Sequence, residues 1–321
     1  MGLWSWFGGS GRSGFGTWST AEEVTEGIDA THLTAIVTGG TSGIGRETAR
    51  VLALRGAEVI IPGRNIESAL RVKESLLKEN PSAKLQAMEM DVSSISSVIS
   101  FARAFNSSNR PLNILVNNAG IMACPFQLSK DGIELQFATN HLGHFLLTNL
   151  LLDKLKSTAK LTGVEGRIVN VSSIAHRYAD SSAMDFHKLN DPSNYKPYDA
   201  YARSKLANIL HANELAKRLQ DEGSNVTANS LHPGVIPTNI SRHMNYRAIP
   251  FSLLKPFLKN VPQGASTTCY VALHPDMEGV SGKYFANCNQ TTPSNQARDL
   301  NLGKKLWELS QDILEKLKQP K

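Results

Sequence analysis

The sequence predicts one doubly wound α/β domain, in which helices cover both faces of a parallel sheet. Three observations support this fold class. Short apolar strand patterns alternate with longer helical patterns, the strands are nearly all apolar rather than alternating, and no linker interrupts the chain from about residue 33 to about residue 286. Strands separated by helices form βαβ crossovers, and a strand that is buried on both faces has no polar side.

The predicted elements follow one another in a regular order. Runs rich in β-branched residues predict strands at 34–38, 58–61, 84–91, 113–117, 167–171, 225–231 and 283–285. Helical periodicity predicts helices near 44–55, 66–79, 94–106, 131–156, 199–221 and 264–273. We therefore expect a single domain over 31–290, a flexible N-terminal tail at 1–30 and a C-terminal extension at 291–321.

Composition excludes several classes of protein. The formal charge is +6, but the basic residues are scattered and no nucleic-acid-binding motif accompanies them, so we expect no nucleic-acid partner. The three cysteines lack the spacing of a metal or disulfide framework, and we expect no metal. No apolar run approaches the roughly 20 residues that span a bilayer.

The first strand runs directly into a glycine-rich turn, and a helical pattern follows at once. This arrangement places backbone amides and the positive end of a helix against a pyrophosphate. Glycines allow the tight turn and the close approach of the backbone to the phosphates. The sequence thus predicts a Rossmann-type dinucleotide site with these residues in contact: Gly39, Thr41, Ser42, Gly43, Ile44 and Gly45.

The end of the second strand indicates which dinucleotide binds. An acidic residue there favours NAD, whereas an arginine pairs with the 2′-phosphate of NADP. Arg64 and Asn65 occupy this place, and Arg46 is placed to stack on adenine or to reach the same phosphate. Both arginines are alternatively plain surface residues, and Pro62-Gly63 can displace Arg64. The charge argument favours NADP(H).

Two further strand ends border the same crevice. Asp91 and Val92 close the third strand and are expected near the adenine, although Asp91 is equally suited to cap the next helix. Asn118, Ala119 and Gly120 follow the fourth strand, where small residues let the chain pass close to the cofactor. We include all five in the predicted cofactor site.

Tyr201 and Lys205 carry the predicted chemistry. Residues four apart on a helix share a face, so the two side chains project together. A tyrosine has an ordinary pKa near 10, and a neighbouring ammonium lowers that pKa by favouring the phenolate. The same lysine can hold the ribose hydroxyls of a nicotinamide. The pair is common by chance, and a surface pair is the alternative interpretation.

Ser173 follows the fifth strand, at the end of the sheet where ligands bind. Its hydroxyl can donate to a substrate oxygen while Tyr201 supplies the proton. Ser172 is adjacent, so the choice between the two serines stays open, with Ser173 favoured. Together these side chains predict hydride transfer between a nicotinamide and a carbonyl or alcohol.

The motifs together resemble the short-chain dehydrogenase/reductase family. The glycine turn, Asn117-Asn118-Ala119-Gly120, Ser173, the Tyr201–Lys205 pair and Pro233-Gly234 occur in the family's order over roughly residues 33–286. The resemblance implies a site made of Ser173, Tyr201 and Lys205.

The same resemblance implies three further roles. Asn140 would anchor a water in a proton relay from Lys205, and Val235 and Thr238 would bind the nicotinamide carboxamide. Segments 120–125, 134–144 and 228–234 resemble the retinol-dehydrogenase-like branch. Segment 19–24 is similar to plant members related to the protein translocon of the chloroplast inner envelope. A chloroplast location at that membrane, with the membrane or the translocon as partner, is implied; the alternative is a cytoplasmic protein.

The segment at about 235–262 is expected to cover the substrate as a lid. It carries an apolar run at 249–258 and basic residues but no acidic ones. An apolar lid suits a lipophilic carbonyl or alcohol, and its charge also suits an anionic membrane surface. The alternative is an ordinary packed pair of helices.

The extension ends in an amphipathic helix at 303–317. Trp307 and the basic start of this helix would suit a groove such as that of calmodulin. Glu308, Asp312 and Glu315 instead favour docking of the helix on its own domain.

The sequence therefore predicts an NADP(H)-dependent oxidoreductase of a small apolar carbonyl or alcohol, with Tyr201 as its acid/base. The alternative is an NADP(H)-sensing regulatory subunit of a chloroplast envelope import complex with little turnover. The complete set of Asn140, Ser173, Tyr201 and Lys205 favours the enzyme, because a sensor has no evident need for Tyr201.

Overall fold

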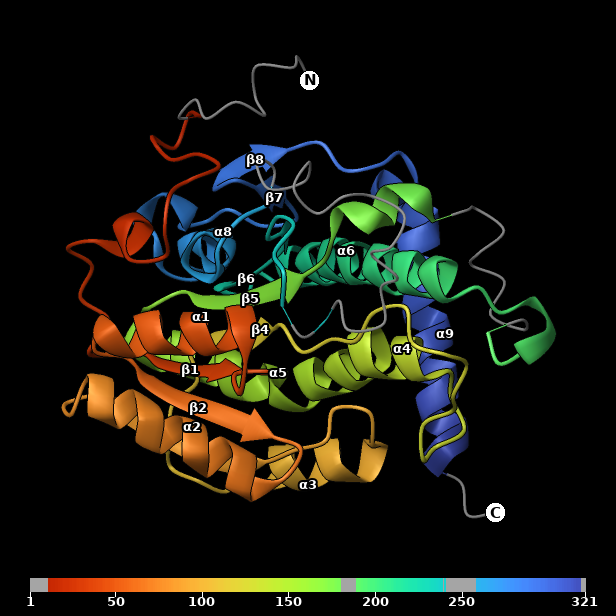
Figure 1. The fold of residues 1–321 in the computed structure, drawn as a ribbon, viewed down its shortest axis with the longest axis horizontal. Helices are drawn as coiled ribbons and strands as arrows, with labels where there is room; N and C mark the ends of the chain where they lie inside the picture. Colours follow the sequence, from red (N-terminus) through yellow and green to blue (C-terminus); the bar gives the residue numbers. More distant parts are fainter. Residues whose placement is uncertain (1–10, 180–188, 239, 241–257, 319–321) are drawn as a thin grey trace.

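The computed structural model describes residues 11–179, 189–238, 240 and 258–318. In this part of the chain the strands form one eight-stranded sheet in the order β3-β2-β1-β4-β5-β6-β7-β8 (Figure 1). Strands β1 to β7 are parallel, and only β8 runs antiparallel, beside β7. The predicted doubly wound parallel sheet in a single domain is confirmed.

The strands are β1 Thr34–Val37, β2 Glu58–Gly63, β3 Lys84–Glu89, β4 Ile114–Asn117, β5 Gly166–Val171, β6 Val226–His232, β7 Tyr284–Ala286 and β8 Asn289–Thr291. The helices are α1 Gly43–Leu54, α2 Ile66–Glu79, α3 Ile95–Asn106, α4 Leu135–Phe137, α5 Gly143–Thr162, α6 Pro197–Asp221, α8 Val261–Leu273 and α9 Leu300–Lys318. The chain order reverses between β1 and β4, which is where a sheet of this kind leaves a crevice for a ligand.

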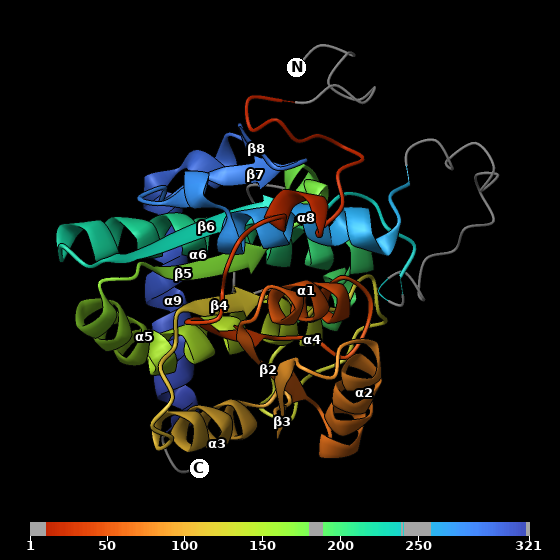
Figure 2. The same ribbon diagram turned by 90° about the vertical axis from the view of Figure 1, so that its left-hand side faces the viewer.

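Alternate strand residues enter two separate cores, because side chains along a strand point to opposite faces. Ile36 and Ile60 pack with α3, α5, α6 and α9, whereas Ala35 and Val59 pack with α1, α2 and α8. Figure 2 shows the two helical layers on either side of the sheet. All four side chains are fully buried, which explains why the patterns of β1 and β2 are nearly all apolar.

Local signals set several helix ends. Asn65 caps α2 by accepting the Ser68 amide at 2.9 Å. Asn260 and Gln263 form a reciprocal capping box at the start of α8. Gly163 ends α5 in the left-handed region, with φ of 73°, where a residue without Cβ is favoured.

The helix predicted at 131–156 is divided in the structure. Its first part is the short α4, then a π-helical turn covers Ala138–Leu142, and α5 begins only at Gly143. The buried Glu134 caps α4 by accepting the amides of Gln136 and Phe137. A π turn inserts one extra residue and re-aims the side chains on it, and such turns are frequent at functional sites.

Strand β2 continues through Pro62 and Gly63 instead of ending before them. Pro62 lies beyond the last register pair that β2 makes with β1, and on its other side it is paired with Met88 of β3. The amide that proline lacks therefore interrupts little of the ladder. Strand β8 was not predicted, and it begins one residue before the expected end of the domain.

Residues 11–30 pack on the domain, where the sequence predicted a flexible tail. Ala21 and Val24 are buried against the α1–α8 face, and the Phe15 ring lies 6.0 Å from that of Tyr270. Glu22 forms an ion pair with Arg50 of α1. A few apolar side chains suffice to dock this Gly- and Ser-rich segment, because α1 and α8 leave a matching apolar surface. Residues 1–10 lie outside the described chain.

Helix α9 docks across α5 and α6. Trp307 is 6% exposed, its ring lies 4.9 Å from that of Phe145, and the Arg218 guanidinium stacks over it at 4.3 Å. Leu306 and Leu314 enter the same core. The apolar face that suggested a calmodulin groove is covered within the chain. Among the described helices, none combines the length and hydrophobicity needed to cross a bilayer.

Candidate active site

The glycine turn is packed so closely that larger residues would not fit. A Cβ on Gly45 would lie 2.3 Å from the Gly39 carbonyl oxygen and 2.4 Å from the Asn118 amide nitrogen. Gly39 has φ of 66°, and a Cβ there would lie 2.8 Å from the Cα of Ala119. The glycines thus let the turn rest directly on the segment that follows β4.

Thr38 joins the glycine turn to the segment after β4 by hydrogen bonds. Its hydroxyl oxygen accepts the amides of Asn118 at 2.8 Å and of Ala119 at 3.0 Å. The Asn118 side chain in turn donates to the Thr38 carbonyl at 2.8 Å. Asn118, Ala119 and the glycine turn therefore form one rigid wall of the crevice.

The start of α1 fits the pyrophosphate of a dinucleotide. Its N-cap, Ser42, makes no side-chain capping bond, and the first turn carries no acidic residue. Gly43 has φ of 53°, and a Cβ there would meet the Thr238 methyl group at 3.4 Å. First-turn amides without a side-chain cap, beside a glycine at the surface of the turn, make an anion site.

The two arginines proposed for the adenosine end differ in the structure. Arg46 is turned toward α2, where it bonds Ser75 at 3.1 Å and forms an ion pair with Glu79. Arg64 stands exposed at the end of β2, and no partner of its side chain is found within the described residues. Arg64 is therefore the residue that is free to meet a phosphate.

Asp91 does not cap α3, whose N-cap is Ser94. Its carboxylate accepts the Ser93 amide at 3.0 Å and the Ser93 hydroxyl at 2.7 Å, which closes the turn after β3. The amide of Ile95 at the start of α3 is bonded by Asp131 at 2.9 Å, a long-range contact that sequence reasoning missed. Val92 is buried, and its carbonyl oxygen lies 1.9 Å from where a Cβ on Gly143 would stand.

Asn140 lies on the π turn and is fully buried. Its side-chain oxygen accepts the Ile121 amide at 2.9 Å, while its amide nitrogen donates to the Ile121 carbonyl and the Ser204 hydroxyl, both at 2.9 Å. The side chain thus ties the loop after β4 to α6. Both ends of the Asn140 side-chain amide already make hydrogen bonds within the protein. The water relay remains a prediction.

His144 is a further link that sequence reasoning missed. Its Nδ1 donates to the Asn140 carbonyl at 3.1 Å, and its Nε2 lies 2.9 Å from the Thr38 hydroxyl. Burial lowers the pKa of His144 to about 4, so the ring is neutral at physiological pH. The spacing of four from Asn140 on a helical pattern was the available signal.

Tyr201 and Lys205 lie inside the molecule, on the face of α6 that meets the strand ends. Tyr201 is 7% exposed and Lys205 is 2% exposed. The Lys205 ammonium lies 5.7 Å from the centroid of the Tyr201 ring and donates to the Val171 carbonyl at 3.0 Å. A Cβ on Gly120 would stand 3.5 Å from the same ammonium, so Gly120 borders it across the crevice.

The two adjacent serines point in different directions. The Ser172 hydroxyl is buried and donates to the Lys205 carbonyl at 2.6 Å. Ser173 instead turns its hydroxyl toward Tyr201, and the hydrogen bond between them lowers the pKa of the phenol. The Ser173 oxygen also accepts the Ala175 amide at 3.2 Å, which leaves its proton free to donate. The two serines follow β5, and the extended backbone there turns neighbouring side chains to opposite sides.

The pKa of Tyr201 shifts in the opposite direction to the one predicted. Burial raises it to about 12, and the Ser173 hydroxyl only partly offsets this. Burial also lowers the pKa of Lys205 to about 8. The expectation that the ammonium dominates is therefore wrong for this structure, because desolvation of the phenolate outweighs a cation that is bonded to a carbonyl.

The segment after β6 borders the glycine turn, as the contact of Thr238 with Gly43 shows. Val235 is 52% exposed, and its carbonyl accepts the Lys259 amide at 2.9 Å. The predicted lid at 235–262 lies largely outside the described residues. Within those residues, no cluster of His, Cys, Asp or Glu is suited to hold a metal ion.

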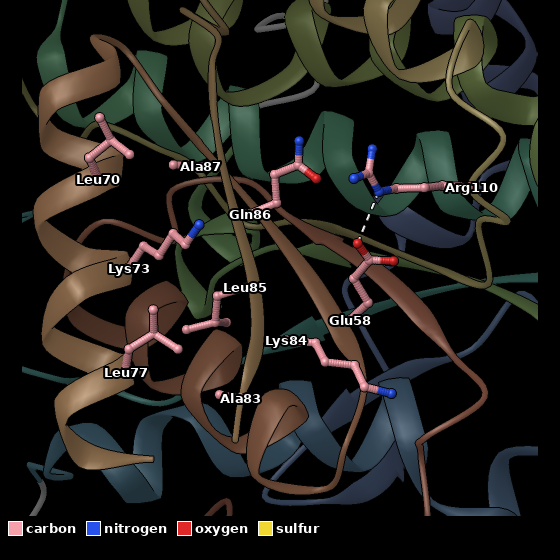
Figure 3. A pocket seen from close by; sticks show the side chains of 10 residues that line it. All are labelled: Glu58, Leu70, Lys73, Leu77, Ala83, Lys84, Leu85, Gln86, Ala87 and Arg110. Carbon is pink, nitrogen blue, oxygen red and sulfur yellow. Dashed lines mark hydrogen bonds and ion pairs between the residues drawn. The ribbon is translucent and has the colours of Figure 1, made fainter. Parts of the chain in front are cut away.

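A separate hollow of about 600 Å³ lies at the far edge of the sheet, between α2 and β3. Figure 3 shows Leu70, Lys73 and Leu77 of α2 facing the strand, with Arg110 bonded to Glu58. It is open to solvent and contains none of the predicted site residues. The crevice at the strand ends, and not this hollow, holds the chemistry.

Comparisons with known proteins agree with this geometry. Residues 33–184 match the family model described as short chain dehydrogenase. The chain is 58% identical over 311 residues to the short-chain dehydrogenase TIC 32 A, chloroplastic, of Brassica napus, covering 97% of both chains. It is 41% identical over 279 residues to retinol dehydrogenase 12 of Mus musculus, covering 87% of this chain and 85% of that one.

Among solved structures, a putative uncharacterized protein from Mycobacterium paratuberculosis superposes with a TM-score of 0.70 at 33% identity, covering 93% of this chain and 97% of that chain. The residues matched by the family model include the glycine turn and Ser173. This chain belongs to the short-chain dehydrogenase family of oxidoreductases.

Proposed function

We propose that this chain uses NADP(H) to interconvert a carbonyl compound and an alcohol, with Tyr201 as the acid/base. The observation that carries the proposal is the cluster of Ser173 with the buried Tyr201 and Lys205 at the strand ends, beside a glycine turn shaped for a dinucleotide. When bound, the nicotinamide supplies the hydride for reduction or accepts it in oxidation.

The side chains of the cluster divide the remaining work. In reduction, the Tyr201 hydroxyl donates its proton to the carbonyl oxygen while a hydride is added to the carbon, and in oxidation the phenolate takes the proton back. The Ser173 hydroxyl donates a hydrogen bond to the same oxygen and orients it. Lys205 places a positive charge beside the phenol and next to Gly120.

The raised pKa of Tyr201 sets the protonation state of the phenol in the free protein. A phenol with a pKa of about 12 is almost fully protonated at neutral pH, so it can donate a proton but cannot accept one. Reduction needs the proton on the phenol, whereas oxidation needs it to be absent.

Arg64 supports NADP(H) as the cofactor, because it is exposed at the end of β2 and is not used elsewhere in the described chain. Replacing Arg64 with Ser should raise the KM for NADPH by about 10- to 100-fold, because a charge-assisted hydrogen bond to the 2′-phosphate is lost. The KM for NADH should hardly change. Arg46→Ser is the matched control, since its partner is Glu79, and equal effects of the two changes would contradict the assignment to Arg64.

A lipophilic substrate is supported by one relative. The mouse protein that is 41% identical is named for retinol, an apolar alcohol. A panel of straight-chain aldehydes and ketones of increasing length tests this proposal. We expect kcat/KM with NADPH to rise with chain length, by up to about fourfold for each methylene that is fully buried, and a preference for short polar carbonyls would contradict it.

Tyr201→Phe is the decisive change for the activity. It removes one oxygen atom, and we expect kcat to fall about 100- to 10,000-fold while NADPH still binds. NADPH consumption with the panel measures kcat, and quenching of protein fluorescence measures binding. If wild type turns over no carbonyl compound although NADPH binds normally, the sensing role of a regulatory subunit replaces the enzyme.

We also propose a chloroplast location, because the relative that is 58% identical carries the designation chloroplastic. Incubation of the radiolabelled chain with isolated chloroplasts tests it. Protease-protected protein that fractionates with the inner envelope would support the envelope and the translocon as partners, and protein that stays outside the organelle would contradict the location.

A further inference from the structure

Two imidazole rings hold the backbone on either side of the Ser173 hydroxyl. The Nδ1 of His176 donates to the Ser173 carbonyl at 2.6 Å. The Nδ1 of His232 accepts the amide of Ile174 at 3.1 Å. The peptide group between Ser173 and Ile174 is thus held at both its oxygen and its nitrogen. We call these two hydrogen bonds, from His176 and to His232, the clamp.

The partners determine which nitrogen of His176 carries hydrogen. A carbonyl oxygen can only accept, so Nδ1 of His176 must carry its proton. The Nε2 of the same ring accepts the Ser294 amide at 3.1 Å, so this nitrogen must be bare. His176 is therefore neutral and fixed in a single tautomer.

His232 is fixed in the opposite tautomer. Its Nδ1 accepts an amide and must be bare, so in the neutral ring the proton lies on Nε2. Protonation would place a hydrogen on a nitrogen that has to accept, in His176 as in His232. An uncharged ring is therefore required for the bond from Ile174 to His232 and for the bond from Ser294 to His176.

Burial, with help from nearby positive charges, keeps the two rings neutral. His176 faces the guanidinium of Arg177, and its ring packs at 5.1 Å against that of Tyr284. His232 faces Lys259, Arg177 and His176. Burial, together with the positive charges of Arg177 and Lys259, lowers the pKa of His176 to about 4 and that of His232 to about 3.

The rings come from distant parts of the chain. His176 follows Ser173 on a 3-10 turn, His232 ends β6, and Ser294 follows β8. The clamp therefore joins the end of β5 to its neighbour in the sheet and to the segment beyond the edge hairpin. Rotation of the Ser173–Ile174 peptide would break both bonds at once.

We propose that His176 and His232 are positioning residues that aim the Ser173 hydroxyl at Tyr201 and at the substrate oxygen. This inference rests on the proposed function, because it assigns a task to a serine of that site. Neither ring transfers a proton itself, and both act through the geometry of one peptide group.

His232→Leu removes the acceptor and keeps a similar volume, whereas His232→Asn offers a carbonyl oxygen close to the position of Nδ1. With NADPH and the aldehyde that wild type reduces fastest, we expect His232→Leu to lower kcat about 10- to 100-fold. The KM for NADPH should change less than about threefold, and His232→Asn should restore most of the kcat. Loss of kcat that Asn does not restore would overturn the proposal.

A double-mutant cycle distinguishes positioning from general damage. If His232 acts through Ser173, His232→Leu should cost little further kcat when it is added to Ser173→Ala. The matched control is His211→Leu, a buried histidine that contacts Asn170 and not Ser173, and its effect should multiply with that of Ser173→Ala. If the effects of His232→Leu and Ser173→Ala on kcat also multiply fully, the clamp is overturned.

The same cycle with His176→Leu serves if His232→Leu does not fold. Failure of the inference is separable from failure of the proposed function. If Tyr201→Phe removes turnover while the changes at His176 and His232 leave kcat intact, only the clamp is wrong. If Tyr201→Phe leaves turnover unchanged, the proposed function fails and the clamp fails with it.

Discussion

Single residues of the site show how burial and hydrogen bonding divide two similar side chains. Ser172 and Ser173 are neighbours with the same hydroxyl, but one is bonded to the Lys205 backbone and the other lies beside Tyr201. Burial likewise moves the pKa values of Tyr201 and Lys205 toward their uncharged forms. Tertiary contacts, not residue type, therefore assign the roles at this scale.

The serine pair gives a prediction with opposite outcomes for stability and turnover. Ser173→Ala should lower kcat about 10- to 1,000-fold with little change in the free energy of unfolding, because it removes a donor to the substrate oxygen. Ser172→Ala removes a buried hydrogen bond to the Lys205 carbonyl and should cost about 0.5–1.5 kcal/mol of stability with a smaller effect on kcat. Steady-state kinetics and urea unfolding measure the two effects, and a reversed pattern would exchange the two serines.

At the scale of elements, the site is assembled from the ends of strands and the starts of helices. The turn after β1 rests on the segment after β4, and the π turn before α5 ties that segment to α6. Helix α9 supports the far side of α5 and α6. Each of these contacts joins elements that are distant in sequence.

The contact between the glycine turn and the β4 segment predicts the effect of a single methyl group. Gly45→Ala would place a Cβ 2.3 Å from the Gly39 carbonyl oxygen, so the turn must open and NADPH affinity should fall at least about 10-fold. The control is Gly303→Ala in α9, where the nearest atom would lie at an ordinary 3.7 Å. This control should bind NADPH normally and gain about 0.5–1 kcal/mol of stability. Unchanged binding by Gly45→Ala in a calorimetric titration would refute the packing argument.

The docking of α9 predicts a large loss of stability on removal of one ring. Trp307→Ala should cost about 3–5 kcal/mol, because the indole fills the space between Phe145 and Arg218. Leu300→Ala, at a side chain that is 65% exposed, should change stability by less than about 0.5 kcal/mol. Urea unfolding measures both variants. Similar small changes in the two would indicate that α9 is not docked in solution.

At the scale of the whole molecule, buried neutral histidines connect the site to the cores. His144, His176 and His211 are almost completely buried, and burial lowers the pKa of the first two to about 4 and that of His211 to about 3. In the unfolded chain each ring titrates near 6.5. Folding therefore requires these rings to stay uncharged.

This requirement predicts a loss of stability in acid. Below pH 6.5 the unfolded chain binds protons that the folded chain does not, so stability is complete above pH 6.5 and falls as the pH drops toward 4. Each ring should cost about 1.4 kcal/mol for each pH unit in this window. Urea unfolding at pH 7.5 and pH 5.5 measures the effect, and His211→Gln should reduce the pH dependence. Equal stability at both pH values would mean that the rings accept a proton in the folded state.

The sequence alone determined the alternation of strands and helices, the glycine turn and the helix that carries Tyr201 and Lys205. These features depend on local periodicity and on residues a few positions apart, which a linear pattern records. The same patterns did not predict β8, the docking of residues 11–30 or the π turn around Asn140, because each depends on contacts with distant segments.

Only the tertiary structure decided which serine faces the phenol, in which direction the pKa of Tyr201 moves and which histidines hold the Ser173 peptide. The pKa of a side chain and the direction of its hydrogen bonds depend on the groups that surround it after folding. Tyr201 and Lys205 are one turn apart in any helix, but they are buried together only because β4, β5 and α6 enclose them.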